Sequence, residues 1–402
     1  APTGQTGRTA WSNEMSKKSA AQNLLLEVMG FAGQRYPRVM PPVLQQDPKK
    51  PVKGGLLGPA EPFLAKQQSD EAVKLLKARR NVQKRIDAGD YDPYFDVSKR
   101  TDVDPSNYPD AAAPNQTLAI MPKKQETIDK YTKQLASPDV ERRLEEAFKK
   151  GLDIPDSDRW YFMGQLEEEF IKEYGPQAGR QMFARMFADP MAATTGGADP
   201  ASNLVTSAYG NYALRTAGKM PEKGYDMPSP VGGRFIGGNA AQFNKMIAGG
   251  QGVTPDNPKR FNFSTNFQGA RDRATMDEQM SKVGFGLNLP PAGTYGLAEL
   301  PVHNLAAKYG TDPRNVQEVI WHGGTGKSGK PMIQFVNEAI ERTRALTGES
   351  PADVVRKALV RAEMPLYSVG AGTAGLAAAN AQKDKKVPAA DILNYLRSQG
   401  GT

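Results

Sequence analysis

Apolar residues recur at helical spacing along most of the chain beyond its first seventy residues. This spacing predicts amphipathic helices over residues 70–88, 126–149, 157–174 and 176–188. Another helix is predicted to open at Pro331, and Ser350 and Pro351 have the residue types that cap and begin one more. Short helices are also expected over 16–31 and after Pro388. Alternating, strand-like runs are scarce, so the expected fold class is mainly α.

Proline interrupts this pattern in two stretches, 1–69 and 90–122. Each proline lacks a backbone donor and biases the preceding residue toward extended geometry, so we expect extended arms there. Such stretches bury too little apolar surface to order themselves. We therefore infer that a partner or a large assembly orders them. The predicted domains are an N-terminal arm with one short helix, helices with a Pro-rich linker, a helical domain and C-terminal helices, over 1–69, 70–154, 155–325 and 326–402.

Composition excludes several kinds of site. The 402 residues include no cysteine, which excludes disulfides, thiolate metal sites and cysteine nucleophiles. The two histidines, His303 and His322, are too few for a multi-histidine metal site. No apolar run approaches the roughly 18 residues of a membrane span. We expect no cofactor, metal or membrane partner, and the net charge of +8 makes DNA a candidate partner.

Two glycine-rich stretches resemble phosphate-binding loops, and each lacks part of the motif. Residues 370–375 read G-x-G-x-x-G, but without the strand before it and the acid after it that a dinucleotide site needs. We interpret them as a helix connection. Residues 321–328 carry Trp321 where a phosphate loop has its first glycine. We expect a basic loop there, whose amides and lysines would contact DNA phosphates.

The most informative stretch is 228–322, in which several short motifs follow one another. They are Asn257-Pro258-Lys259-Arg260-Phe261 with Asn266, Ala274-Thr275-Met276-Asp277, and Pro313-Arg314-Asn315-Val316-Gln317 leading to Trp321. This order resembles a domain of unknown function found in tailed-bacteriophage proteins, and the run 188–200 resembles the same family. The resemblance covers roughly residues 155–325.

That phage family is similar to helix-hairpin-helix DNA glycosylases and to phage enzymes of thymine hypermodification. The resemblance implies a helical, glycosylase-like core in which Asp277 stands at the position of the catalytic carboxylate. Such an acid stabilises the positive charge on the sugar, or orients water, as an N-glycosidic bond breaks. Lys259 is the nearest candidate for a lysine nucleophile, which would need a lowered pKa. The sequence departs from glycosylases in having Glu278 and Gln279 after the aspartate and no Leu-Pro-Gly-Val-Gly hairpin.

Basic and amide side chains are the candidate nucleic-acid ligands. They are Lys259, Arg260, Asn266, Lys327, Lys330, Lys77, Arg80 and Lys84. Simpler structural roles remain open: Asp277 as a helix cap, the basic residues as a solvated face, and Trp321, Phe261 and Phe263 as core residues.

Two functions are consistent with these patterns. The favoured one is a bacteriophage virion protein that packs on other virion proteins or packaged DNA within a large assembly. The alternative is a DNA base-processing enzyme, acting in the virion or the host cytoplasm, that flips a nucleotide into a pocket containing Asp277. A base-sized cleft with Asp277 at its mouth and Lys259 beside it would favour the enzyme. A filled cleft, or Asp277 bonded only to nearby backbone, would favour the virion protein.

Overall fold

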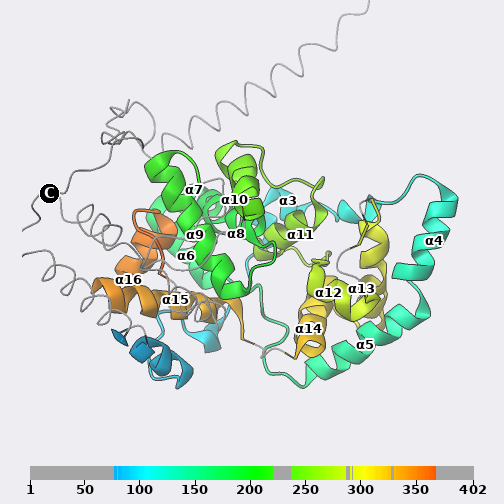
Figure 1. The fold of residues 1–402 in the computed structure, drawn as a ribbon, viewed down its shortest axis with the longest axis horizontal. Helices are drawn as coiled ribbons and strands as arrows, with labels where there is room; N and C mark the ends of the chain where they lie inside the picture. The colour runs from blue at the N-terminus through cyan, green and yellow to red at the C-terminus, as the bar shows by residue number, and fades with distance from the viewer. Residues whose placement is uncertain are drawn as a thin grey trace, which may run out of the picture. The chain divides into compact units, whose positions relative to one another are not determined.

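The described part of this protein is helical. The computed structural model describes residues 77–78, 80–220, 237–286, 290–291, 293–326 and 330–367. These residues belong to one unit, Asp70–Thr402, and contain no strand (Figure 1). The mainly α fold class is therefore confirmed. The arm and helix expected within 1–69, the loop at 370–375 and the helix after Pro388 lie outside the described residues.

Helical segments follow one another closely along the chain. Residues 80–87 form the first helical stretch. The short elements that follow are η1 (Val97–Lys99), η2 (Pro105–Asn107), α3 (Pro109–Ala112) and η3 (Thr117–Ala119). The next are α4 (Gln125–Leu135), α5 (Pro138–Leu152), α6 (Gly164–Tyr174), α7 (Pro176–Phe183), η4 (Ala184–Ala188), α8 (Asp189–Thr194) and α9 (Pro200–Ala217). The last are α10 (Gly237–Phe243), η5 (Asn244–Ala248), α11 (Pro258–Phe267), α12 (Glu278–Phe285), α13 (Tyr295–Tyr309), α14 (Pro313–Thr325), α15 (Met332–Thr347), α16 (Pro351–Val354) and η6 (Val355–Val360).

Several predicted helix boundaries are confirmed and two are wrong. Ser350 caps α16 by accepting the Asp353 amide at 3.1 Å, and α15 follows Pro331 as expected. The single helix expected over 126–149 is wrong, because Ser137 caps a new helix there, α5, with Pro138 in its first turn. The helix expected from residue 157 begins only at Gly164.

The Pro-rich stretch 90–122 packs on its own chain, and the expectation that a partner orders it is wrong. The Tyr108 hydroxyl donates to Glu167 at 2.5 Å, and the Thr117 hydroxyl donates to Glu299 at 2.6 Å. The Phe95 amide donates to the Asn337 side chain at 2.8 Å. Buried hydrogen bonds to distant helices thus replace the regular structure that proline prevents.

The described helices form two packed regions (Figure 1). One buries apolar residues of α4, α5, α12, α13 and α14 against each other, so helices on either side of the predicted boundary at 154 share a core. The other contains an aromatic chain in which Phe183 stacks on Phe187 at 5.5 Å between ring centroids, and Phe187 meets Phe267 at 5.3 Å. The first region contains α12 and α14, and the second contains α11.

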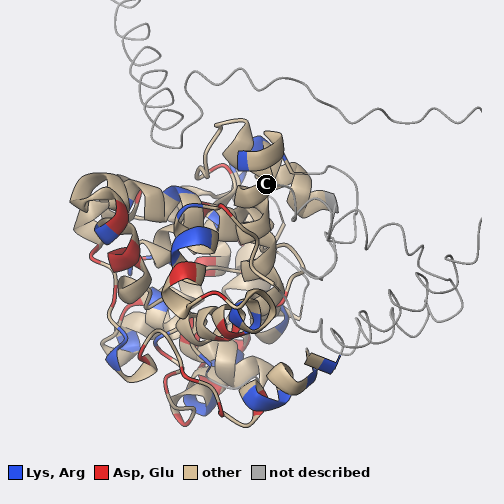
Figure 2. Cartoon of the chain, turned by 90° about the vertical axis from the view of Figure 1, so that its left-hand side faces the viewer, with Lys and Arg blue, Asp and Glu red and all other residues tan. Residues whose placement is uncertain are grey.

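Charged residues of both signs are interspersed along the described helices. In the view of Figure 2, Lys and Arg lie among Asp and Glu and do not gather into a single patch. Among the described helices, none combines the length and the apolarity that a membrane crossing requires.

Candidate functional site

A cavity of about 460 Å³ lies where the two packed regions meet. Its volume is within the range of roughly 300–1,000 Å³ that is typical of small-molecule sites. Its walls come from the turn before α6, α8, the loop before α9, α9 itself, α11, the segment that enters α12, and α14. Its lining includes the side chains of Trp160, Tyr161, Asn203, Lys259, Phe263, Thr275, Asp277, Gln279, Gln317 and Trp321.

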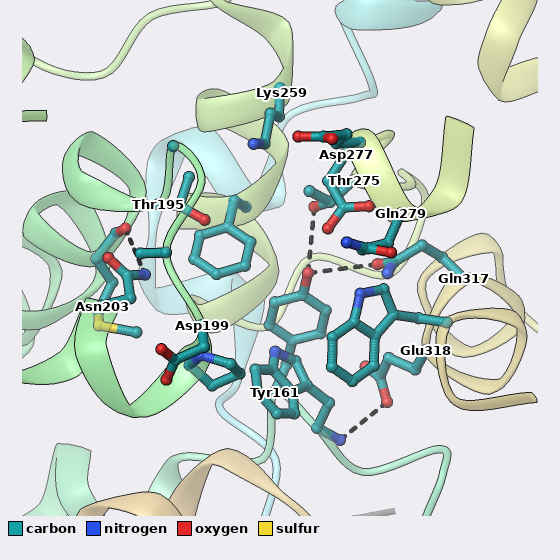
Figure 3. Close-up of a pocket in the computed structure, with 18 of the residues that line it drawn as sticks. Tyr161, Thr195, Asp199, Asn203, Lys259, Thr275, Asp277, Gln279, Gln317 and Glu318 are labelled. Carbon is teal, nitrogen blue, oxygen red and sulfur yellow. Dashed lines mark hydrogen bonds between the residues drawn. The ribbon is translucent and has the colours of Figure 1, made fainter. Parts of the chain in front are cut away.

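Asp277 and Lys259 line the same cavity. Lys259 lies in the first turn of α11, and Asp277 immediately precedes α12. Both side chains lie at the upper rim in the close-up view (Figure 3). The structure therefore brings together the two residues that the phage-family resemblance implied for catalysis.

Asp277 is both a helix cap and a residue of the cavity wall. Its Oδ1 accepts the Met280 amide at 2.8 Å, which caps α12. Burial raises the pKa of the Asp277 carboxyl, while this hydrogen bond, the Lys259 charge and a hydrogen bond from the Trp321 indole act to lower it. Asp277 is bonded to nearby backbone, as the virion role predicts, and it also lines a cleft, as the enzyme role predicts. Each prediction therefore holds in part.

Lys259 is partly buried among charged groups that shift the pKa of its ammonium in both directions. Burial lowers the pKa of the Lys259 ammonium, and neighbouring Arg260 lowers it further, whereas Asp277 and Glu278 raise it. A lysine with a lowered pKa is more often the neutral amine, which is the nucleophilic and basic form.

Hydroxyl and amide groups form one wall of the cavity. The Tyr161 hydroxyl lies 3.2 Å from Thr275 Oγ1 and 3.3 Å from Gln317 Oε1. Asn266 donates to Thr275 Oγ1 at 3.3 Å from behind the wall. Neutral donors and acceptors of this kind can pair with the edge of a nucleobase without requiring a charge on it.

Aromatic rings form other parts of the lining. Trp160 and Trp321 pack at 5.4 Å between centroids with an interplanar angle of 39°, and Phe263 meets Tyr161 edge to face at 5.8 Å. All four rings line the cavity, so they combine a packing role with a surface on which a flat ligand can stack. Phe261 is only 2% exposed and does not line the cavity, so its predicted core role is confirmed.

The loop before α9 is held close to its neighbours. Asn239 donates to the Gly196 carbonyl at 2.8 Å, and a Cβ on Gly196 would stand 2.6 Å from Asn239 Oδ1. On α9, Asn203 donates to the Met191 carbonyl at 3.0 Å and accepts from Thr194 at 2.6 Å. Asn203 thus uses one donor and one acceptor of its side-chain amide on the protein, and these two bonds tie α9 to α8.

The other predicted nucleic-acid ligands that the structure describes do not line the cavity. Asn266 is completely buried, so it supports Thr275 and does not face a ligand. Lys330 forms an ion pair with Glu338 and lies 4.6 Å from the centroid of the Phe335 ring. Arg260 is half-buried beside Lys259.

Three further basic candidates, Lys77, Arg80 and Lys84, are exposed. They belong to a segment that is tied to α15, where Arg85 bonds Glu341 at 3.1 Å, and none of them lines the cavity. Lys327 lies outside the described residues.

The expected phosphate-contacting loop at 321–328 is wrong in its described part. Gly323 and Gly324 lie within α14, where Gly323 packs on the backbone of α5 and Gly324 on Val283.

The two histidines are not exposed to a ligand in the cavity. His322 belongs to the cavity wall but is only 1% exposed, and His303 lies on α13 and does not line the cavity. Within the described ranges, no three His, Asp or Glu side chains gather as a metal site would require.

Comparisons of the chain with protein-family models, with curated proteins and with solved structures found no match. The resemblance to the phage domain and to glycosylases therefore stays a prediction from short motifs.

The uncharged cavity wall formed by Tyr161, Thr275 and Gln317 was not predicted from the sequence. Thr275 and Gln317 both stand within the recognised motifs, two residues before Asp277 and four before Trp321, yet nothing in the sequence marked them as site residues. Tyr161 adjoins Trp160 in a segment that was expected to be helical. Its place beside Thr275 and Gln317 depends on the turn before α6.

Proposed function

We propose that this protein is a DNA base-processing enzyme that takes a single nucleobase into the cavity and breaks its N-glycosidic bond, with Asp277 as the catalytic carboxylate. One observation carries the proposal: Asp277 and Lys259, from separate elements, face one cavity that also has aromatic and amide walls. Enzymes that act on a base extrude it into a pocket, stack it on aromatic side chains and pair with its edge. The cavity has a group suited to each of these tasks.

In the proposed reaction, the bond between sugar C1′ and the base nitrogen breaks, and its electron pair leaves with the base. Positive charge develops on the sugar, and the Asp277 carboxylate stabilises it. The oxygen of a water molecule forms the new bond to C1′, and the proton that this water loses balances the proton that the departing base takes up. In a variant of this route, the neutral amine of Lys259 attacks C1′ in place of water.

This proposal departs from the virion role that the sequence favoured. Part of the support for that role came from the Pro-rich stretch 90–122, which is ordered by its own chain through contacts such as Thr117 with Glu299. The remaining support comes from residues 1–69, outside the described residues. Packing on virion proteins or packaged DNA, and location in the particle, stay predictions from the sequence.

A base-release assay tests the proposed function. Single-stranded and duplex oligonucleotides, together with thymine-hypermodified phage DNA, are incubated with the protein, and abasic sites are then quantified. We expect the wild-type protein to form abasic sites and Asp277→Asn to reduce the rate by at least about 100-fold.

Asp312→Asn is the matched control. Asp312 Oδ1 caps α14 by accepting the Asn315 amide at 2.8 Å, the same geometry as Asp277 on α12, but Asp312 does not line the cavity. Asparagine is also a good N-cap, so both variants keep their helix starts. Equal rates in the two variants, or no abasic sites from wild type on any of these substrates, would refute the proposal.

A further inference from the structure

Two neighbouring cations, Lys259 and Arg260, lie in the first turn of α11 and form no ion pair with a described residue. Arg260 Nε is buried, yet it has no hydrogen-bond partner within the described ranges. Burial lowers the pKa of the Arg260 guanidinium, and no carboxylate acts to raise it. Burying part of a charged group without an acceptor is costly, so an anion bound here would stabilise the protein.

The acidic residues of the cavity wall that are not fully buried, by contrast, have partners of their own. Asp199 caps α9, where its carboxylate accepts the Ser202 amide at 3.0 Å and the Ser202 hydroxyl at 2.6 Å. Asp277 caps α12, and Glu278 forms an ion pair with Lys282. The charge without a partner at this end of the cavity is therefore positive.

The loop between α8 and α9 lies beside these cations. Thr195, Gly196 and Gly197 line the cavity, and Thr195 and Lys259 both lie in the upper half of the close-up view (Figure 3). A Cβ built on Gly196 would stand 3.9 Å from Arg260 Nη2. The amides of Gly196 and Gly197 form no hydrogen bond with a carbonyl of the described chain. The loop therefore brings two backbone donors, without acceptors of their own, to the same place as the two cations.

This combination of donors is suited to a phosphate group. An arginine offers a fork of N–H donors that matches phosphate oxygens, and a lysine adds a point charge. Backbone amides also bind phosphate oxygens, and glycine lets the backbone approach the anion closely. A group of phosphate donors thus lies next to a cavity whose aromatic and amide walls suit a flat base.

We propose that Lys259, Arg260 and the loop 195–197 bind the phosphate group on the sugar of the base that occupies the cavity. The inference deepens the proposed function and rests on it. It gives the ligand a chemical class, a nucleoside phosphate ester, which is present both in a free nucleotide and in a nucleic-acid strand. A nucleoside without phosphate would lack half of the recognised groups.

The phosphate site also distinguishes the two routes of the proposed reaction. A bound phosphate stabilises the ammonium form of Lys259, because a nearby anion raises the pKa of a lysine. The charged amine is not a nucleophile, so this role selects water over Lys259 as the group that attacks C1′. Arg260 takes part in neither route, and its substitution therefore tests the site without removing a reacting group.

The first measurement is binding, which needs no catalytic activity. Calorimetry compares the four deoxynucleosides, their 5′- and 3′-monophosphates and a mixed-sequence single-stranded oligodeoxynucleotide. At least one phosphorylated probe should bind wild type about tenfold or more tightly than its nucleoside. Tight binding of the monophosphates assigns the site to free nucleotides, and tight binding of the oligonucleotide alone assigns it to a strand.

Variants show whether Arg260 provides this affinity. Arg260→Met should remove most of the advantage of the phosphorylated probe, and Arg260→Lys, which keeps the charge, should retain part of it. Lys150→Met is the matched control, because it removes an exposed cation of α5 that does not line the cavity. Its affinities should equal those of wild type.

The salt dependence of oligonucleotide binding gives a second measurement. Each phosphate contact to a single strand contributes about 0.7 to the slope of log K against log salt. Arg260→Met should reduce that slope by about this amount, and Lys150→Met should leave it unchanged. In base release, Arg260→Met should raise KM about tenfold with little change in kcat.

The results separate the two proposals. Equal affinities for nucleosides and all phosphorylated probes, or wild-type affinity and salt slope in Arg260→Met, would overturn the phosphate site and leave base release intact. Phosphate-dependent binding that requires Arg260, in a protein that releases no base, would instead remove the proposed function and leave the phosphate site in place.

Discussion

Gly323 of α14 lies against Gly151 of α5 with no room for a side chain. A Cβ on Gly323 would stand 2.4 Å from the Gly151 amide nitrogen and 2.0 Å from the Ala147 carbonyl oxygen. Backbone cannot withdraw from such a contact as a flexible side chain can. The close approach therefore fixes α14, and with it the position of Trp321 in the cavity wall.

Replacing Gly323 with alanine should destabilise the fold. Although alanine favours helices intrinsically, the added methyl group forces α5 and α14 apart, and we expect Gly323→Ala to lower the free energy of unfolding by about 1–3 kcal/mol. Guanidinium denaturation measures the change. Gly238→Ala on α10 is the control, because a Cβ there meets nothing within 4 Å, and it should be neutral or stabilising. Equal stabilities in the two variants would show that the helices separate without cost.

The hydrogen bond from the Thr117 hydroxyl to Glu299 should stabilise the packing of residues 115–119 against the neighbouring helices. Glu299 is completely buried and also accepts Asn262 Nδ2 at 2.8 Å and the Ala274 amide at 2.9 Å. Thr117→Val removes one donor from this carboxyl, so we expect a loss of about 1–3 kcal/mol. Denaturation of Thr216→Val, whose hydroxyl bonds only within its own exposed turn, provides the comparison. A loss no larger than that of the control variant would contradict the account.

Stability should fall as pH rises from mildly acidic to mildly alkaline values. Burial raises the pKa of Glu318 to about 8 and that of Glu299 to about 7. The unfolded chain releases these protons near pH 4.3, so at higher pH it holds fewer protons than the folded chain and unfolding becomes easier. This contribution is fully present below about pH 4 and is lost by about pH 8.

A variant isolates the share of Glu318. Glu318→Gln mimics the protonated carboxyl and does not titrate, so its free energy of unfolding should decline less between about pH 5 and about pH 8. Guanidinium midpoints across that range measure the difference between variant and wild type. A constant difference at every pH would mean that Glu318 has an ordinary pKa in the folded protein.

The charge on Lys259 should determine the pH at which base release declines on the acid side, because this charge lowers the pKa of Asp277. Burial raises the pKa of Asp277 and the nearby Lys259 ammonium lowers it. Activity should therefore fall as the pH drops through a pKa above the usual aspartate value, and Lys259→Met should move this limb to higher pH. Lys308→Met, which removes a cation paired with Glu145 on a different surface, should leave the limb in place. An unmoved limb in Lys259→Met would mean that the two charges do not interact.

The helices were predictable where a single apolar stripe coincides with a capping signal, as at Ser350 and Pro331. The break at Ser137 was not, because apolar residues such as Leu135 and Leu144 continue the same helical pattern on both sides of it. Gly323 and Gly324 are typical of a loop in sequence. They are helical because α14 must approach α5 and Val283 closely, and this tertiary requirement has no local signal.

The candidate site was predictable only in its charged part. The order of short motifs indicated Asp277 and Lys259, and both line the cavity. Tyr161 was missed because its position depends on a turn, and its partners Thr275 and Gln317 come from two distant segments. A cavity wall assembled from three parts of the chain becomes visible only when they are packed together.

A crystal structure of Asp277→Asn with a bound single-stranded oligodeoxynucleotide tests the central claim most directly. The account predicts one extruded base inside the cavity, stacked on Trp321, with its edge toward Thr275 and Gln317 and its C1′ beside residue 277. An oligonucleotide bound on another face, with no base in the cavity at saturating concentration, would contradict it.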